Sequence, residues 1–576
     1  MQKGALIFWL VILITGNAFS QSTNASLNED YYHWLDRYEV KAGRVVPELF
    51  TTVKPYKRSD IAAYIDSLMN KYDGFTDRAG GDTWRDTDIF NYDYLRNDSW
   101  EWTRATTSDS KKPLLKHFYR KKSDFLHVDQ PDFDLHISPV LYAGLGKDSE
   151  RSGTSFINTR GIELRSMIDK KVGVYMFFTE NQAVLPMYVD RELSNNPVIP
   201  HEGFWKRFKD NGVDFFQARG YIDAKISKHI YAQLGHDRMF IGNGVRSLIW
   251  SDNAPPQLYL RANVKVWKLN YLFQINRMVA DVTGSANGTT NGKYPEKYVA
   301  FHHASFNVGK KLNFGFFESV VFSPQDSVNG DKASFEWNYV NPVIFYRAIE
   351  QQFGSADNAI VGADAKWNIV RGVSMYGQFV LDEFYLKHIR ARDGWWANKF
   401  AGQLGVKYID AFAVPNLDLQ IETNFVRPYT YSHGTNYASY TNYRQPIAHP
   451  LGANFRELIG VARYQPIGKL NIVAKLMYAK GGVDLPGDNW GGNLLKNNST
   501  REMELGNKIG QGVPYKRTLM SLTASYMVKH NVFVDLQLIS RKNNYDIGNV
   551  NTLVSGTSNI TSLALRWNIA RRNYDF

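Results

Sequence analysis

The stretch LDLQIETNF, residues 417–425, decides the fold because its side chains alternate between apolar and polar. One parity holds Leu417, Leu419, Ile421 and Phe425, and the other holds Asp418, Gln420, Glu422 and Asn424. A period of two is typical of a strand with one apolar and one polar face. The same alternation recurs in NAIVGADAKWN (358–368), KLNIVAKLMY (469–478) and VFVDLQL (532–538). The chain is therefore predicted to be all-β from Phe133 onward.

The connections between these strands distinguish a membrane barrel from a soluble sandwich. Tight polar turns lie at 169–171, 227–229, 308–311, 370–372 and 529–531. Long segments lie between the strand pairs, at 184–214, 241–256, 279–296, 323–357, 428–454 and 481–515. Alternation of short turns and long loops is typical of outer-membrane barrels, whose apolar face meets lipid and whose polar face lines the lumen. Eight hairpins between about 158 and 541, with one strand before and one after, predict an antiparallel barrel of about 18 strands.

The N-terminal residues MQKGALIFWLVILITGNAFS, 1–20, read as a secretory signal peptide, because the apolar run is too short to span a bilayer. The alternative is a retained anchor. No later apolar run approaches about 20 residues. The chain has no cysteine, which excludes disulfides and thiolate metal sites. An exported chain with 14% aromatic residues and no spanning helix favours an outer-membrane barrel.

Residues 21–130 have a different pattern, because RSDIAAYIDSLMNKYDG places apolar residues at helical spacing after Ser59, a predicted N-cap. We expect a small helical periplasmic domain there, followed by a transmembrane barrel with long extracellular loops at 131–576. An even strand number leaves both termini in the periplasm and the long loops at the cell surface. The formal charge of +12 is scattered along an exported chain, which favours contact with lipopolysaccharide or acidic glycan over nucleic acid.

Residues 334–358 predict a helix within an outer loop, because Pro342 suits a first helical position and apolar residues follow at four-residue spacing. A helix at this place can fold into the barrel and narrow the pore; the alternative is a helix lying over the outer rim. The predicted contacts join Arg347 and Glu350 of the loop to three carboxylates of the lumen. Those carboxylates are Asp364, Asp418 and Glu422.

The segment 428–458, PYTYSHGTNYASYTNYRQPIAHPLGANFREL, is rich in tyrosine although it has no strand pattern. Tyrosine presents an apolar face and a polar tip, which suits packing on sugar rings, and arginine adds a bidentate donor for acidic groups. The alternative is that the rings pack the loop against itself or belong to the aromatic girdle. The candidate glycan-binding residues are Tyr429, Tyr431, His433, Tyr437, Tyr440, Tyr443 and Arg444.

YSHGTNYASYTNYRQPIAHPLGANFREL, together with WNYVNPVIFYRAIEQQFGSADNAIVGADAKW upstream, resembles the Wzi-type capsule-assembly family. It is most similar to the RemB-like gliding motility proteins within that group. The resemblance implies an 18-stranded outer-membrane barrel with a periplasmic helical bundle. It also implies a surface role, either in holding capsular polysaccharide or in surface motility. Ala453 stands after Pro-Leu-Gly, where the family usually has histidine, which favours the gliding branch.

The sequence contains no constellation that an enzyme would need. His302 and His303 are adjacent on a strand and point to opposite faces, so they cannot chelate one metal. Ser432 and His433 are neighbours in sequence, which does not build a catalytic triad. We therefore expect a non-enzymatic surface protein without metal or cofactor, supporting gliding, adhesion or polysaccharide attachment. Its expected partners are surface polysaccharide or lipopolysaccharide and the motility or secretion machinery of the envelope. The alternative function is a porin or transport channel for small polar solutes or glycans.

Overall fold

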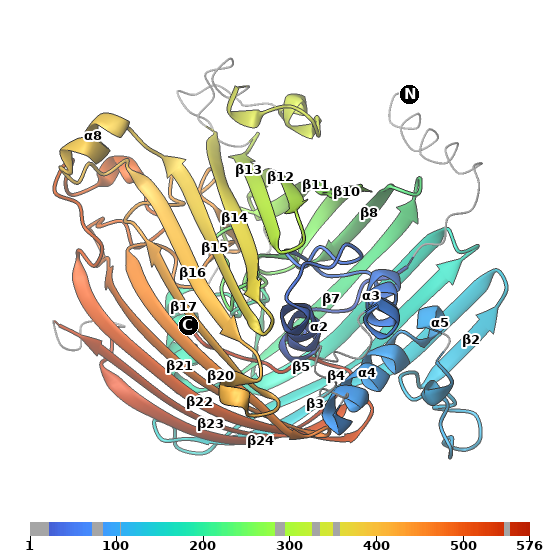
Figure 1. Ribbon diagram of the computed structural model, residues 1–576. Helices are drawn as coiled ribbons and strands as arrows, with labels where there is room; N and C mark the ends of the chain where they lie inside the picture. Colours follow the sequence, from blue (N-terminus) through green and yellow to red (C-terminus); the bar gives the residue numbers. More distant parts are fainter. Residues whose placement is uncertain are drawn as a thin grey trace, which may run out of the picture.

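The computed structural model describes residues 22–71, 85–103, 105–282, 294–324, 335–348, 357–546 and 553–576. Eighteen antiparallel strands of this described part form a closed barrel, which confirms the predicted fold and strand number (Figure 1). The wall consists of β3 (Phe133–Asp148), β4 (Thr154–Ile168), β5 (Val172–Val184), β7 (Gly212–Lys225), β8 (Ile230–Asp237), β10 (Gln257–Val266), β11 (Leu269–Val279), β12 (Glu296–Val308), β13 (Leu312–Phe322), β14 (Asn358–Val370), β15 (Val373–Glu383), β16 (Lys399–Tyr408), β17 (Leu417–Val426), β20 (Phe455–Ile467), β21 (Leu470–Val483), β22 (Val513–Lys529), β23 (Val532–Tyr545) and β24 (Gly556–Trp567).

The alternation of side chains places polar residues inside the barrel and apolar residues outside. On β17, Glu422 and Asn424 are buried in the lumen, whereas Ile421 is 55% exposed on the outer face. Because burying Glu422 and Asn424 costs free energy unless they are hydrogen-bonded, the inner face needs polar partners. Among the described residues, no helix is long and apolar enough to cross a membrane.

The two ends of the barrel differ in the length of their connections, as the sequence predicts. Strands such as β4 and β5 pair up to Ile168 and Val172, across a turn of three residues. We call this side of the barrel the short-turn end and the opposite side the long-loop end. Smaller elements occupy the connections: η2 (Thr106–Ser108), β2 (Leu126–Gln130), α6 (Met187–Asn195), β6 (Lys206–Phe208), β9 (Phe240–Ile241), η3 (Trp337–Val340), α8 (Leu386–Ala391), η4 (Ala411–Ala413), β18 (Thr441–Asn442), β19 (Gln445–Pro446) and η5 (Asn498–Thr500).

The N-terminal segment forms helices that pack into the barrel rather than standing apart from it (Figure 1). Its elements are α2 (Glu29–Ala42), β1 (Val53–Lys54), α3 (Arg58–Lys71), α4 (Asp86–Asp98) and α5 (Trp100–Thr103). Asn28 caps α2 by accepting bonds from the backbone N–H groups of Asp30 and Tyr31. The apolar faces of these helices share one core with Met527 and Phe533 of the wall. The helices therefore complete the interior of the barrel, which a separate domain would not do.

The barrel closes between its first strand, β3, and its last strand, β24. We call this the split seam, because two different strands pair with the two halves of β3. β24 pairs with residues 141–148 of β3, whereas the short-turn half of β3 pairs with β2. Pro139 lies between the two partners, where its missing N–H leaves no donor unpaired. Asn568, with a positive φ of 53°, donates its side-chain N–H to the Pro139 carbonyl at 2.8 Å. The chain turns there, and the tail 568–576 runs into the lumen.

Candidate functional site

Ion pairs join helix α2 to the inward-facing side chains of the wall. Arg37 bonds to Asp418 of β17, and its other nitrogen lies 2.6 Å from Asp410. The preceding residue, Asp36, lies 2.6 Å from Lys366 of β14. Other pairs of the helix with the wall are Glu29 with Arg463 (3.2 Å), Glu29 with Lys475 (2.8 Å), Glu39 with Lys366 (2.6 Å) and His33 with Asp418 (2.9 Å). The charges on α2 are thus complementary to those of the lumen, and the helix occupies part of it.

The predicted lumen carboxylates lie inside the barrel, but their partners differ from the predicted ones. Asp364 lies 2.6 Å from His303 of β12. Glu422 accepts the backbone N–H groups of Val245 and Arg246 at 2.7 and 3.1 Å. Together with the Arg37–Asp418 contact described above, the bonds of Glu422 show that α2 and the loop after β9 lie in the lumen. We call the segments that occupy the lumen the plug.

The prediction that a helix at 334–358 fills the lumen is therefore corrected in part. The lumen carboxylates Asp418 and Glu422 contact α2 and the loop after β9 instead. Arg347 donates its backbone N–H to Glu318 of β13 at 2.8 Å. Glu350 lies outside the described residues. Asp418 and Glu422 take their partners from α2 and the 241–250 loop, and Asp364 takes His303 of the wall.

The C-terminal tail ties the N-terminal helix to the loops at the other side of the lumen. Arg571 lies 2.6 Å from Asp30 of α2, and Asp575 lies 3.1 Å from Arg246. The hydroxyl of Tyr188 on α6 donates to the Tyr574 carbonyl at 2.6 Å. Both ends of the chain therefore take part in the plug.

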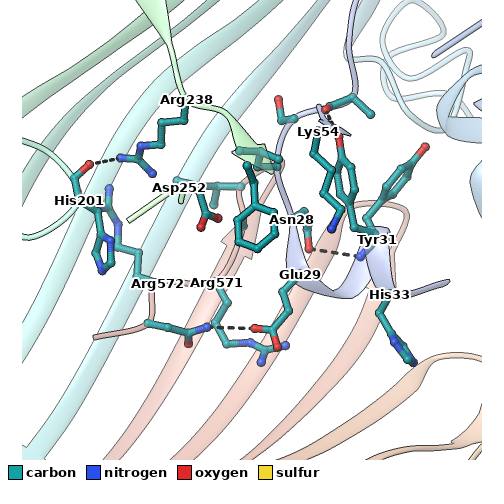
Figure 2. A pocket seen from close by; sticks show the side chains of 18 of the residues that line it. Asn28, Glu29, Tyr31, His33, Lys54, His201, Arg238, Asp252, Arg571 and Arg572 are labelled. Carbon is teal, nitrogen blue, oxygen red and sulfur yellow. Dashed lines mark hydrogen bonds between the residues drawn. The ribbon is translucent and has the colours of Figure 1, made fainter. Parts of the chain in front are cut away.

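A polar cavity of about 370 Å³ remains between α2, the tail and the loop before β10 (Figure 2). Figure 2 shows Arg238, Arg571 and Arg572 on one side of it and Lys54 on the other. Burial, together with the charge of Lys407 nearby, lowers the pKa of Lys54 to about 7. Lys54 therefore carries only part of a positive charge at neutral pH, which reduces the attraction of the cavity for anions.

The tyrosine-rich loop 428–454 folds inward and covers the lumen at the long-loop end. Tyr429, Tyr431 and Tyr440 are 0%, 1% and 1% exposed. Their hydroxyls donate to the carbonyls of Asn489, Leu248 and Ile249, at 2.7, 2.7 and 3.0 Å respectively. The rings of Tyr431 and Tyr440 stack with centroids 5.9 Å apart. These three rings cannot stack on a sugar from outside, because the loop uses them for its own packing.

The other predicted glycan-binding residues of this loop are half-buried. Arg444 lies 3.5 Å from Asp281, and Tyr443 contacts Tyr294 edge-on. Burial and the charge of Lys399 lower the pKa of His433 to about 4, so its imidazole is neutral at physiological pH. Together with Tyr437, these residues stay candidates for glycan contact.

A second aromatic segment, FYLKHIRARDGWW at 384–396, is exposed where the first is buried. Tyr385 is 54% exposed, and its ring lies 6.0 Å from that of Trp395. His388 stacks on Trp395 at 4.8 Å and lies 2.5 Å from Asp393. The same segment carries three exposed cations: Lys387, Arg390 and Arg392. We call the three rings and the three cations the aromatic platform.

A neighbouring loop holds the aromatic platform in place. The backbone N–H of Trp396 donates to Glu504 at 3.0 Å, and Gly506 donates to Asp393 at 2.8 Å. Gly394 has a φ of +69°, and a Cβ there would meet the Asn507 nitrogen at 2.7 Å, so the close approach of the two loops requires glycine. A surface held this way keeps its rings ordered before any ligand arrives.

The aromatic platform lies in a loop, 384–398, that is not among the long loops predicted from the sequence. The signal was present: two adjacent tryptophans and a tyrosine alternate with Lys387, Arg390 and Arg392 over 13 residues.

Comparison with known proteins gives one family and one fold. The family model "Capsule assembly protein Wzi" matches residues 144–545. Wzi of Escherichia coli, a carbohydrate-binding β-barrel of the outer membrane involved in group 1 capsule assembly, is a similar solved structure. It has 14% identity over 95% of this chain and 100% of that chain, with a TM-score of 0.55, which shows the shared fold.

Weaker likenesses connect the chain with two other outer-membrane proteins. OprD of Pseudomonas aeruginosa has 11% identity over 75% of this chain and 93% of its own, with a TM-score of 0.40. OccAB2 of Acinetobacter baumannii has 10% identity over 76% and 98%, with a TM-score of 0.40. No curated protein matches the chain by sequence.

Proposed function

The chain belongs to the Wzi family of capsule assembly proteins, and we propose that it holds polysaccharide at the cell surface without acting on it chemically. In this proposal the barrel lies in the outer membrane with both termini towards the periplasm. The long-loop end faces outward, so that the aromatic platform meets the glycan.

The observation that carries the proposal is the exposure of the aromatic platform. Rings such as Tyr385 present an apolar face to a sugar and a polar tip to water. Lys387, Arg390 and Arg392 form no ion pair within the described residues and can meet carboxylate or phosphate groups of the glycan. The E. coli relative binds carbohydrate, which supports a similar ligand here.

A binding measurement tests the proposal directly. Purified protein in detergent is titrated with polysaccharide from the surface of the cells that make it. Replacing Tyr385 and Trp395 with alanine should weaken binding about tenfold, which corresponds to about 1.4 kcal/mol. Phe412→Ala is the matched control, because Phe412 is 73% exposed in a turn at the short-turn end. Equal binding by wild type and the double variant would contradict the proposal.

A transport channel is the alternative function, and the plug argues against it. Helix α2, the tail and the loop after β9 occupy the lumen through the ion pairs described above. We expect no steady conductance of porin size when the purified protein is recorded in a planar bilayer. Sustained porin-like conductance at low voltage would favour transport over attachment.

Gliding motility, the branch that the sequence resembles most, stays a prediction. Deletion of the gene separates the two roles when capsule retention and spreading on agar are both scored. Loss of capsule with normal spreading supports polysaccharide attachment. Loss of spreading with normal capsule supports the gliding branch.

A further inference from the structure

Four cations form a row on the outer face of the wall near the long-loop end. Arg456 of β20 lies opposite Lys480 of β21, which lies opposite Lys516 of β22. Lys542 of β23 lies opposite Thr518, and is therefore the diagonal neighbour of Lys516. All four side chains are exposed. We call them the cation row.

The cation row is unfavourable unless an anion from outside the chain neutralises it. Residues directly opposite on antiparallel strands have Cβ atoms about 4.5–5.5 Å apart, and like charges there are destabilising. No ion pair involves any member of the row within the part of the chain that the structure describes.

Two exposed cations elsewhere on the outer face have carboxylate partners on the neighbouring strand. Arg160 of β4 lies opposite Glu180 of β5 in the register, with 3.3 Å between the charged atoms. Arg277 of β11 lies 2.5 Å from Glu296 of β12. Asp546 of the same face is diagonal to Lys516, but the register places no carboxylate directly opposite Arg456, Lys480 or Lys516.

An apolar band begins two residues along the strands from the cation row, towards the short-turn end. Leu458 follows Arg456 on the outer face of β20 and is 47% exposed. Met520 of β22 is 54% exposed and Leu476 of β21 is 46% exposed. The row therefore lies where an apolar surface meets a polar one, the level of lipid headgroups in a membrane.

A groove of about 920 Å³ indents the wall within this apolar band. Gly460, Ala462 and Ala474 line it with small side chains, and a Cβ added at Gly460 would meet no atom within 4 Å. Leu476, Met520 and other large apolar residues also line it. The groove and the cation row share β20, β21, β22 and β23, so one amphipathic ligand can occupy both.

We propose that this surface binds a phosphorylated glycolipid of the outer leaflet, with its phosphates on the cation row and its acyl chains in the groove. The charge of the row matches phosphate, and the groove matches hydrocarbon. The placement rests on the proposed outward orientation of the long-loop end. The glycan-binding role of the aromatic platform does not depend on it.

The test uses the full-length protein in nanodiscs of uncharged lipid, with lipid A as the probe and native mass spectrometry to count retained molecules. We expect wild type to retain lipid A. The triple variant Arg456→Gln, Lys480→Gln and Lys516→Gln should lose at least about nine-tenths of the retained lipid A. A tenfold loss of affinity corresponds to about 1.4 kcal/mol. Arg160→Gln with Arg277→Gln is the matched control and should retain lipid A. Heat-dependent mobility in gels checks that every variant is folded.

Three further arms make the result decisive. Gly460→Leu fills the groove without touching the row and should reduce retention as well. Lipid A without phosphates should bind weakly to wild type, and millimolar inorganic phosphate should not displace intact lipid A.

Equal retention by wild type and the triple variant, or displacement by inorganic phosphate, would overturn the proposal. Because the triple variant should keep wild-type polysaccharide binding, failure here is distinguishable from failure of the proposed function.

Discussion

Two aromatic segments lie at the long-loop end, and they use their rings in opposite ways. Loop 428–454 buries Tyr431 and Tyr440 against the loop after β9. The aromatic platform leaves Tyr385 more than half exposed beside Trp395. The first segment closes the barrel, and we propose that the second meets the glycan.

The difference shows that aromatic content does not locate a binding surface. Each of the three buried tyrosine hydroxyls of loop 428–454 donates to a backbone carbonyl, as Tyr431 does to Leu248 at 2.7 Å. Such a bond satisfies the polar tip while the ring packs in the core, so burial is favourable. The platform instead leaves Tyr385 54% exposed, although the loop at 504–507 holds its backbone in place.

The largest expected effect comes from removing a buried ring. Tyr431→Ala should lower the free energy of unfolding by about 3–5 kcal/mol, the usual loss for a large aromatic residue in a core. Thermal unfolding followed by circular dichroism measures the change. Tyr385→Ala is the control and should leave the midpoint within error, since its ring is exposed. Equal effects of the two substitutions would remove the contrast between the segments.

A smaller effect is expected from the charges of the aromatic platform. Lys387→Gln, Arg390→Gln and Arg392→Gln together should weaken binding of an acidic polysaccharide about tenfold at low salt, or about 1.4 kcal/mol. The difference from wild type should shrink as salt rises, because screening acts on exposed charges. Isothermal titration at two salt concentrations measures both. Loss of binding that is independent of salt would assign the cations a packing role instead.

The smallest effect is expected at Tyr437, which is half-buried in loop 428–454. Tyr437→Ala should change the free energy of unfolding by no more than about 0.5 kcal/mol, as surface substitutions usually do. The polysaccharide titration on the same variant sharpens the comparison. A clear loss of affinity would extend the binding surface from the platform to this loop, whereas unchanged affinity would confine it to the platform.

The barrel could be predicted from sequence because its signal is local. The parity of LDLQIETNF alone assigns Glu422 to the lumen and Ile421 to the outer face, and the structure agrees. The turn at 169–171 is likewise visible in a few polar residues between two alternating runs.

The plug and the binding surface could not be predicted in the same way, because they depend on contacts between distant segments. Nothing within residues 29–42 indicates that Arg37 meets Asp418, which lies 381 residues later. Whether Tyr431 is buried depends on Leu248, in a loop that its own sequence does not identify as a partner. Such pairings come from tertiary packing rather than from local periodicity.

The split seam beside β3 has a consequence for how the molecule is made. Helix α2 is synthesised first and the tail last, yet Asp30 and Arg571 meet inside the closed cylinder. The contact between Asp30 and Arg571 therefore forms only after the last strand, β24, has been synthesised. The interior of the barrel is complete only when both ends of the described chain have reached it.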